Sequence, residues 1–398
     1  MKLKDICEFI VDCPHSTAKD EGEGYPLIRT PNIGKGRLLL DGVHRVSEEV
    51  YQSRISRGIP SKNDLILARE APIGNVAIIK NEGRICLGQR TVLLRPDKNC
   101  VNPDFLMYYL ISPEQQGKLI GSSNGATVNH LNMVNIRNLD VNIPCLKVQS
   151  RIASILSAYD DLIENNQKQI KLLEEAAQRL YKEWFVDLRF PGHEDVEIVD
   201  GLPVGWEWKK LGEVCETYGG GTPSTKESSY YENGNLLWVT PTDITKNNSL
   251  VLLDTEKKIT EEGLKNSSAK ILPEECILMT SRASVGYFGI CERSVCTNQG
   301  FISCVPNKKC FQMYLLYNLL NRVEEIRQKA GGSTYLEISK KTFRDFEIVL
   351  PDVDVLMEFQ KIEHKIFEDT RSLAKKIVSL KEARDRLLPK LMSGEVEV

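Results

Sequence analysis

The chain has 398 residues, of which 41% are hydrophobic and 27% are charged, and its formal net charge is -3. This length and composition indicate a globular protein of two to three domains. No apolar run approaches the roughly 18–20 residues that span a bilayer, and no signal sequence is recognisable after Met1, so a cytoplasmic location is expected. The weakly acidic balance is unusual for a protein that binds nucleic acid unaided, because such proteins usually carry a basic excess.

Short apolar runs separated by Gly, Pro, Asn and Asp make up residues 1–147, a pattern typical of strands joined by turns. A helix is predicted to begin at Pro103, with Asn102 as its N-cap. Residues 205–351 repeat this plan, so each copy is predicted to be a mixed α/β domain with its own core. The predicted strands cover residues 25–29, 64–68, 75–79 and 90–94, then 236–240, 276–280 and 300–305, and a further helix is predicted over 312–321.

The repeat is also visible residue by residue. Residues 3–8 return as residues 211–216, and residues 125–144 align with residues 332–351 without a gap at an offset of 207. This period exceeds the roughly 20–50 residues of a solenoid unit. It predicts a duplicated domain, each copy followed by a long helix, in a molecule that grips something at two places.

Two segments, residues 148–190 and 352–398, carry the heptad spacing of a coiled coil. The first has an unbroken apolar seam over more than four heptads with one polar member, Asn166, and the second repeats the rhythm less cleanly. The first seam consists of Ile152, Leu156, Tyr159, Ile163, Asn166, Ile170, Leu173, Ala177, Leu180 and Trp184, and the second of Leu373, Ile377, Leu380, Arg384, Leu387 and Leu391.

A single seam cannot be buried alone, so the two helices are predicted to pack on each other as an antiparallel coiled coil. The two α/β domains would then be related by a pseudo-two-fold axis. A coiled coil between two copies of the chain is the alternative. Residues 191–204 are predicted to form an acidic linker.

The sequence contains no complete motif for catalysis or for metal binding. Residues 102–105 lack the second proline of an amino-methyltransferase signature, and the glycine-rich residues 218–224 lack the Gly-Lys-Ser/Thr of a phosphate loop. Cys13 beside His15 is weak evidence for a thiol nucleophile, because catalytic pairs meet in space. Neither the cysteine spacings nor the five histidines fit metal-ligand patterns, so no metal site and no catalytic residue is predicted.

The 11 cysteines are an odd number, which favours a reducing compartment over a disulfide framework. Three of them recur in the second copy, and matching cysteines in two copies of one fold predict small buried side chains. The recurring pairs are Cys7 with Cys215, Cys86 with Cys296, and Cys100 with Cys310.

Polar residues recur after the predicted strands. Gln89 matches Gln299, and Arg69 lies close to Arg282 with a shift of one in the best alignment. Arg can donate to guanine and Gln or Asn can bond adenine in the major groove, whereas Ser and Thr at loop tips suit phosphate contacts. For any single residue the alternative is a solvated turn or a local backbone cap. The candidate DNA-binding residues are His15, Ser16, Thr17, Arg29, Thr30, Asn32, Arg69, Gln89, Arg90, Thr222, Ser224, Thr240, Thr242, Asp243, Ser281, Arg282, Gln299, Ser333 and Thr334.

These features resemble the DNA-specificity subunit of type I restriction–modification enzymes over nearly the whole chain. Residues 220–224 and 238–244 are similar to that family's opening of a target-recognition domain, and residues 281–286 to its Ser-Arg-x-Gly-x-Ile-Gly turn. Residues 172–185 look like its central spacer helix and residues 388–395 like its C-terminal one. The first copy departs from the pattern at residues 69–74 and opens instead with the alternative form at residues 11–17.

The resemblance implies a non-catalytic subunit in which each target-recognition domain reads one half of a bipartite, asymmetric DNA site. The helices would set the spacer between the halves and dock two methyltransferase subunits. S-adenosylmethionine, ATP and Mg would be bound only by partner subunits, which carry adenine-N6 methylation and restriction, and the methyltransferase would flip the target adenine. The rival hypotheses are a recognition module of a single-polypeptide enzyme and a coiled-coil scaffold without a DNA role.

The implied domains are target-recognition domain 1 (residues 1–147), the central spacer helix (148–190), the linker (191–204), target-recognition domain 2 (205–351) and the C-terminal spacer helix (352–398).

Overall fold

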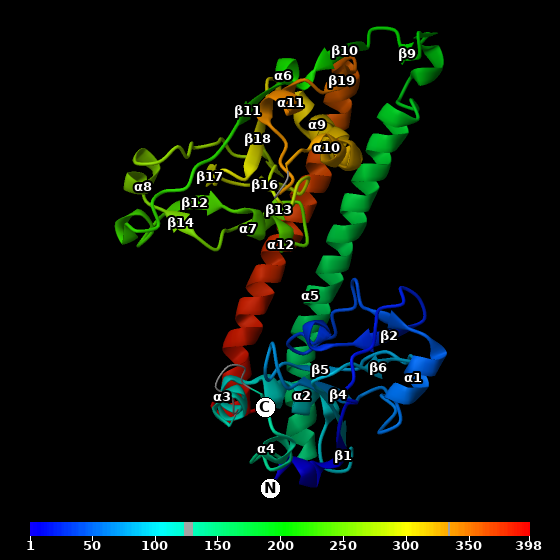
Figure 1. The fold of residues 1–398 in the computed structure, drawn as a ribbon, viewed down its shortest axis with the longest axis vertical. Coiled ribbons are helices and arrows are strands. Elements are labelled where there is room, and N and C mark those ends of the chain that lie inside the picture. The colour runs from blue at the N-terminus through cyan, green and yellow to red at the C-terminus, as the bar shows by residue number, and fades with distance from the viewer. Residues whose placement is uncertain (123–129, 333–334) are drawn as a thin grey trace. The chain divides into compact units, whose positions relative to one another are not determined.

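The computed structural model describes residues 1–122, 130–332 and 335–398. The chain forms two compact units, and Figure 1 labels most of their elements. Unit 1 contains Met1–Ile163 and Ser379–Val398, and unit 2 contains Glu164–Val378. Two long helices, α5 (Leu146–Tyr181) and α12 (Val353–Ser393), are each divided between the two units.

The main sheet of unit 1 has the strand order β1-β7-β4-β5, in which all neighbours are antiparallel. Alternate residues of β4 enter two different cores: Leu65 and Leu67 pack with helix α2, whereas Ile66 and Ala68 pack in a smaller core on the other face. The strand is therefore apolar throughout because both faces are covered. The strands are β1 (Cys7–Asp12), β4 (Leu65–Ala68), β5 (Val76–Ile78) and β7 (Thr91–Pro96).

A second sheet of unit 1, with the order β3-β2-β6, packs on the smaller core through Ile28 and Leu87. The predicted helix cap is confirmed, since Asn102 Oδ1 accepts a hydrogen bond from Phe105 N at 3.0 Å where α2 begins. The remaining elements are β2 (Tyr25–Ile28), β3 (Arg45–Val46), β6 (Cys86–Leu87), α1 (Glu48–Arg54), α2 (Pro103–Ile111), α3 (Pro113–Gly121) and α4 (Met133–Arg137).

Unit 2 repeats this plan, as the duplication predicted. Its main sheet has the order β11-β18-β15-β16-β13, so its first four strands take the places of β1, β7, β4 and β5. Its second sheet, β14-β12-β17, takes the place of β3-β2-β6. The strands of these sheets are β11 (Cys215–Tyr218), β12 (Leu236–Val239), β13 (Val251–Leu252), β14 (Lys258–Ile259), β15 (Ile277–Thr280), β16 (Phe288–Cys291), β17 (Val295–Thr297) and β18 (Phe301–Pro306).

Short elements complete unit 2. The predicted helix over 312–321 is confirmed as α9, and the linker region contains a small hairpin, β8 with β9. The bounds are β8 (Ile198–Val199), β9 (Leu202–Pro203), β10 (Glu207–Lys210), β19 (Glu347–Leu350), α6 (Leu211–Val214), α7 (Pro241–Thr245), α8 (Glu261–Lys265), α9 (Gln312–Asn321), α10 (Val323–Lys329) and α11 (Lys340–Arg344).

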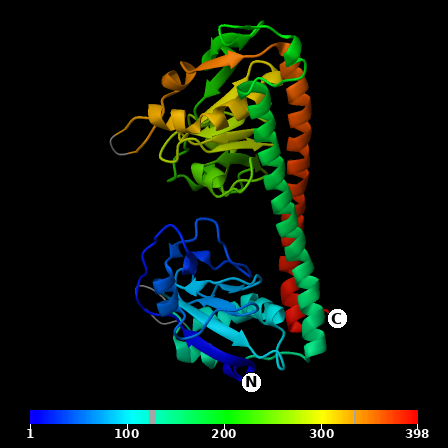
Figure 2. The same cartoon turned by 90° about the vertical axis from the view of Figure 1, so that its right-hand side faces the viewer.

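The heptad seam of α5 faces inward as predicted, because seven of its ten residues are buried and the other three half-buried. In unit 1, Arg384 Nη1 of α12 lies 2.5 Å from Asp160 Oδ1 of α5. In unit 2, the rings of Tyr181 and Phe359 are 6.4 Å apart. The residue numbers of α12 therefore fall as those of α5 rise, so the two helices are antiparallel. Within each unit, both views show them side by side (Figures 1 and 2). The antiparallel coiled coil is confirmed within one chain, and the pseudo-two-fold relation stays a prediction.

The recurring cysteines need one correction. Cys86, Cys215 and Cys296 are buried as predicted, but Cys7 and Cys310 are only half-buried and Cys100 is exposed. Cys100 lies in the turn after β7, where its Sγ donates to Asp97 Oδ2 at 3.4 Å, so this position is a turn rather than a core site. All 11 cysteines are free thiols.

Candidate nucleic-acid interface

The topology of unit 1 brings several loops to one edge of the main sheet. Strand β7 is antiparallel to both β1 and β4, so the ends of those two strands flank its start. Strands β2 and β6 are parallel and end together at Ile28 and Leu87. Residues 88–90 join β6 to β7, so the loops after β1, β2 and β4 all meet at this three-residue link.

Backbone hydrogen bonds hold these loops together. Gly88 N donates to Ile28 O at 2.8 Å, and Arg69 N donates to Arg90 O at 2.8 Å. Cys13 N donates to Thr91 O at 3.2 Å. We call this set, residues 13–17, 29–32, 69–74 and 88–90, the first loop cluster.

Unit 2 contains the same arrangement. Asn298 N donates to Val239 O at 3.1 Å, Ser281 N donates to Gly300 O at 2.8 Å, and Gly221 N donates to Thr297 O at 2.9 Å. These bonds join the loops after β11, β12 and β15 to the link between β17 and β18. We call residues 219–224, 240–243, 281–286 and 298–300 the second loop cluster.

A glutamine ties the first loop of each cluster to the link. Gln89 Nε2 donates to His15 O at 2.6 Å and to Thr17 Oγ1 at 2.9 Å. In unit 2, Thr222 Oγ1 donates to Gln299 Oε1 at 2.5 Å. The match of Gln89 with Gln299 in the sequence is therefore a match in space, and in both clusters the partner is a threonine of the opening loop.

Two candidate residues serve as backbone caps. Asn32, which is 6% exposed, accepts from Arg29 N at 3.1 Å and donates to Leu39 O at 3.0 Å. Asp243 Oδ2 accepts from Thr240 N at 2.8 Å and from its hydroxyl at 2.6 Å. Both side chains fix the turn after the first strand of the small sheet.

The two arginines that lay close in the alignment occupy different places. Arg69 Nη1 lies 3.0 Å from both carboxylate oxygens of Asp12, and Arg69 Nε donates to Leu131 O at 2.8 Å. Leu131 N donates a backbone hydrogen bond to Arg69 O, and in unit 2 Ile338 N donates one to Ser281 O. Leu131 and Ile338 are 207 residues apart, the offset of the repeat, so Arg69 corresponds to the buried Ser281.

Arg90 and Arg282 are the exposed arginines of the two clusters. Arg90 Nε lies 2.9 Å from Glu70 Oε2, and Arg282 Nε lies 3.6 Å from Glu337 Oε2. About half of each arginine side chain is exposed, 59% and 48% respectively, so both guanidinium groups can reach a ligand without unfolding a loop.

The other candidates fall into two groups. Those at the exposed loop tips are His15, Ser16, Thr17, Thr222, Ser224, Thr242 and Gln299, and those half-buried beside them are Arg29, Thr30, Gln89 and Thr240. His15 Nε2 lies 3.0 Å from Asp12 Oδ2. Ser333 and Thr334 lie outside the described residues. Cys13 is buried, and burial raises the pKa of its thiol, which argues against a nucleophile.

One pair of arginines was missed from the sequence. Arg137 Nη2 donates to Ile10 O at 2.9 Å, and Arg344 Nη2 donates to Thr217 O at 3.1 Å. Arg137 and Arg344 match in the gapless alignment of residues 125–144 with 332–351, so the sequence contained the signal for the arginines although not for the strands that they contact. Each arginine binds the backbone of the first sheet strand just before its loop cluster.

A hollow of about 660 Å³ opens beside the second loop cluster. Its wall carries three basic side chains, Lys270, Lys340 and Arg344, and one acidic one, Glu216. It is lined by Gly212, Cys215, Glu216, Thr217, Tyr218, Gly219, Gly220, Ser268, Lys270, Lys340 and Arg344.

The glycines of this loop are required by packing rather than by phosphate-loop chemistry. A Cβ on Gly220 would lie 2.0 Å from Thr297 O, and one on Gly221 would lie 2.3 Å from Ser268 Oγ. The backbone of the glycine-rich loop therefore packs directly on neighbouring backbone, which only residues without a Cβ permit.

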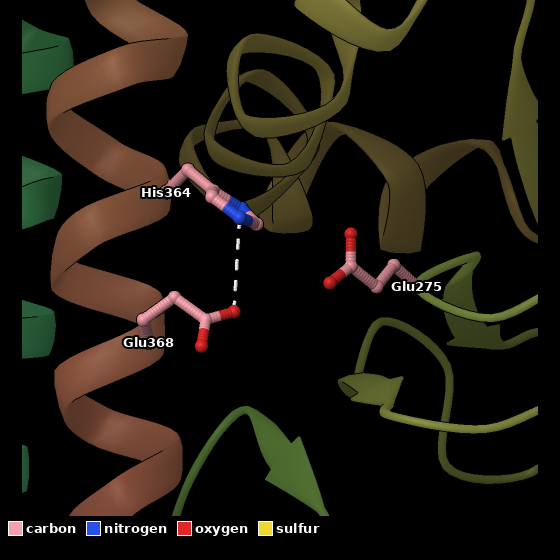
Figure 3. Close-up of side chains that lie close together, drawn as sticks. All are labelled: Glu275, His364 and Glu368. Atoms are coloured by element: carbon pink, nitrogen blue, oxygen red, sulfur yellow. Dashed lines mark ion pairs between the residues drawn. The ribbon is translucent and has the colours of Figure 1, made fainter.

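Unit 2 also contains a cluster of charged side chains that the residue spacings in the sequence did not indicate (Figure 3). His364 and Glu368 are one turn apart on α12, and Glu275 precedes β15; their ligand atoms lie within 4.8 Å of one another. Arg371 of α12 contacts the Glu368 carboxylate, and its Nη1 lies 3.8 Å from Glu275 Oε1. The guanidinium supplies the positive charge that a metal ion would bring, so the cluster joins α12 to the loop before β15 as an ion-pair network.

Comparison with known proteins gives a consistent result. The profile of the type I restriction modification DNA specificity domain matches residues 1–175 and 203–381. The chain is 30% identical to the type I restriction enzyme MjaIX specificity subunit of Methanocaldococcus jannaschii, over 100% of this chain and 93% of that protein. It is 26% identical to the HindI specificity subunit of Haemophilus influenzae, over 84% of this chain and 87% of that protein.

The fold has a solved counterpart. The crystal structure of the type I restriction-modification system S subunit from M. genitalium superposes with a TM-score of 0.58 at 17% identity, covering 98% of this chain and 95% of that one. The mixed α/β architecture with two specificity domains and long helices is thus the architecture of this class of protein. The chain belongs to the family of type I restriction–modification DNA specificity domains.

Members of this family are non-catalytic by role, since they supply specificity to a restriction system. Over the described part of the chain, no helix is both long and apolar enough to cross a membrane.

Proposed function

We propose that this chain is the DNA-recognition subunit of a type I restriction–modification complex, in which each loop cluster reads one half of a bipartite, asymmetric DNA site. The observation that carries the proposal is that both units present the same loop cluster, with the same Gln–Thr contact, on different loop sequences. A shared framework with different loops suits the reading of two different short sequences.

The candidate residues divide into those proposed to contact DNA and those whose side chains hold the loops in place. Contacts to base edges are assigned to arginine, glutamine and histidine side chains that remain exposed or half-buried although they also contact their own loops, and contacts to phosphates to the hydroxyls at the loop tips. The proposed base-reading residues are His15, Gln89, Arg90, Arg282 and Gln299, and the proposed phosphate contacts are Ser16, Thr17, Thr30, Thr222, Ser224 and Thr242. Asn32, Arg69, Thr240, Asp243 and Ser281 are assigned to holding the loops, because their polar groups serve local contacts or are buried.

The helices are assigned the spacing and docking roles. Residues 1–147 and 205–351 would be the recognition domains, residues 148–190 and 352–398 the spacers, and residues 191–204 the linker. Two methyltransferase subunits with S-adenosylmethionine would dock on the helices, and restriction subunits would add ATP- and Mg-dependent translocation. The net charge of -3 is compatible with this assignment, because partner subunits would neutralise part of the DNA phosphate charge.

Exchange of one recognition domain tests the proposal. Residues 205–351 are replaced by the corresponding domain of another specificity subunit, and the methylated motif is read by methylation-sensitive sequencing of host DNA. One half of the motif should change while the other stays. Loss of both halves would contradict independent readout by the two clusters.

Two rival hypotheses make different predictions. For a coiled-coil scaffold without a DNA role, deleting the chain would leave the host methylation pattern unchanged; membership of the DNA specificity family does not favour it. For a recognition module of a single-polypeptide enzyme, the neighbouring genes would lack separate methyltransferase and translocase subunits.

A further inference from the structure

We propose that the basic hollow beside the second loop cluster is a DNA-backbone anchor, in which Lys270, Lys340 and Arg344 bind phosphodiester oxygens without reading sequence. This inference rests on the proposed function, since it presupposes that duplex DNA lies on the loop cluster. It adds residues that the sequence did not single out, and it assigns them to affinity rather than to specificity.

The charge of the hollow is not compensated. Lys270 Nζ lies 5.7 Å from the centroid of the Tyr218 ring, and among the described residues neither Lys270 nor Lys340 has an ion-pair partner. Arg344 donates to Thr217, to the carbonyl at 3.1 Å and to the hydroxyl at 2.6 Å. The carboxylate of Glu216 accepts the Tyr218 hydroxyl. Three cations thus face one carboxylate in a chain whose overall charge is negative.

The shape of the hollow leaves room for an approaching phosphate. A Cβ on Gly219 would meet Lys340 Nζ at 3.2 Å, so the absence of a side chain there keeps the lysine head and the loop backbone open to one ligand. Ammonium and guanidinium groups make charge-assisted hydrogen bonds to phosphate oxygens, and such contacts hold a duplex in position while carrying no base information.

The hollow is continuous with the proposed reading surface. Gly219 and Gly220 line it, and Thr222, two residues further on, bonds Gln299 at the centre of the second loop cluster. A strand whose bases face Gln299 and Arg282 would therefore carry its neighbouring phosphates toward Lys270 and Lys340. This continuity favours the DNA backbone over a free anion as the occupant.

Unit 1 lacks the same chemistry at the equivalent positions. Arg137 takes the place of Arg344, but the 207-residue offset puts Met133 where unit 2 has Lys340. The matching contacts of Arg137 with Ile10 O and of Arg344 with Thr217 O put Asp12 where unit 2 has Gly219. The carboxylate of Asp12 is held by Arg69. The pair of lysines with the open glycine is therefore not repeated in unit 1, where a different basic residue, the exposed Arg57, donates to Cys13 O at 3.2 Å. The two copies should then differ in their contribution to salt-dependent binding.

The test measures DNA affinity against salt with the full chain bound to the methyltransferase subunit of its own system. Two labelled duplexes are used, one with the methylated motif and one with the motif scrambled. Lys270→Ala with Lys340→Ala should weaken both by about ten-fold or more at physiological salt, and the slope of log K against log[salt] should fall by one to two. Lys98→Ala is the control and should change neither, because this exposed lysine lies in the turn after β7, at the opposite end of that strand from the first loop cluster. Lys270→Arg with Lys340→Arg keeps the charge and should retain the slope.

The outcomes separate this inference from the proposed function. An unchanged slope in the double alanine variant, with normal binding by the unmodified complex, would overturn the anchor alone. Weakening confined to the motif duplex would also overturn it, because the lysines would then read bases. Stabilisation of the unmodified protein by inorganic phosphate that the double variant loses, with the DNA slope unchanged, would reassign the hollow to a free anion. Failure of the unmodified complex to prefer the motif duplex would overturn the proposed function itself.

Discussion

Arg384 of α12 donates from Nη1 to Asp160 Oδ1 of α5 at 2.5 Å, and this ion pair fills the polar position of the C-terminal heptad seam. The Tyr108 hydroxyl donates to the other oxygen of the same carboxylate, also at 2.5 Å. Burial and the neighbouring Asp160 raise the pKa of Tyr108, so its phenol remains a donor. One carboxylate therefore joins α5, α12 and α2 within unit 1.

Asp160→Ala should destabilise the protein by about 2–3 kcal/mol, because it leaves the buried Tyr108 phenol without its acceptor and leaves the mostly buried Arg384 guanidinium with the exposed Asp385 carboxylate as its remaining partner. Asp161→Ala, at the exposed neighbouring position, is the control and should stay within about 0.5 kcal/mol. Urea unfolding midpoints of the two variants give the comparison. A double-mutant cycle with Arg384→Ala measures the pair itself, and additive losses would show that the two groups do not interact.

Glu363 gives unit 2 a pH-dependent stability. It lies on α12 at 1% exposure, and burial, only partly offset by Tyr317, raises the pKa of its carboxyl to about 8. The folded state then binds a proton that the unfolded chain releases near its ordinary pKa of about 4.3. This contribution to stability is fully present below about pH 4, declines as pH rises, and is lost above the folded-state value.

Glu363→Gln should therefore raise the melting temperature at pH 9 relative to the unmodified protein and change it little at pH 5. The glutamine keeps the shape of the protonated acid but cannot ionise. Glu358→Gln, at an exposed site on the same helix, is the control and should follow the unmodified curve. Thermal unfolding from pH 5 to pH 9 reads the difference, and parallel curves for Glu363→Gln would mean that Glu363 ionises without cost.

Replacement of Arg69 should lower stability, whereas replacement of Arg282 should change DNA specificity. Arg69→Ala removes the partner of Asp12 and the donor to Leu131 O, so it should cost about 2 kcal/mol of stability. Arg282→Ala removes a half-exposed side chain and should leave stability within about 0.5 kcal/mol while relaxing one half of the methylated motif. Denaturation midpoints together with methylation-sensitive sequencing separate the two effects. A specific loss of motif in Arg69→Ala without destabilisation would reverse the assignment.

Sequence patterns within short segments predicted much of the secondary structure and the packing of the long helices. The heptad spacing predicted the inward seam of α5, and the Asn-Pro start predicted the cap on α2, because both depend on residues close in sequence. The match of Gln89 with Gln299 marked positions that the structure places at equivalent points. The correspondence of Arg69 with Ser281 could not be fixed by alignment, since it is set by strand pairing with residues far along the chain. Lys340 and Arg344 lie one turn apart on α11, whereas Lys270 follows α8, so only the folded chain brings the three basic side chains together beside β11.

The register of the helix pair allows a sharp test of the spacer. Asp160 meets Arg384 in unit 1 and Ala177 packs in one core with Phe367 in unit 2, so deleting residues 163–169 of α5 requires deleting residues 375–381 of α12 to keep the seam aligned. Seven residues of helix rise about 10 Å, roughly three base pairs of B-DNA. The paired deletion should shorten the gap in the methylated motif by about that number and leave both half-sequences unchanged. Deleting only residues 163–169 is the control: it sets the seams of the two helices out of register and should abolish methylation. An unchanged gap in an active paired deletion would show that the helices do not set the spacing.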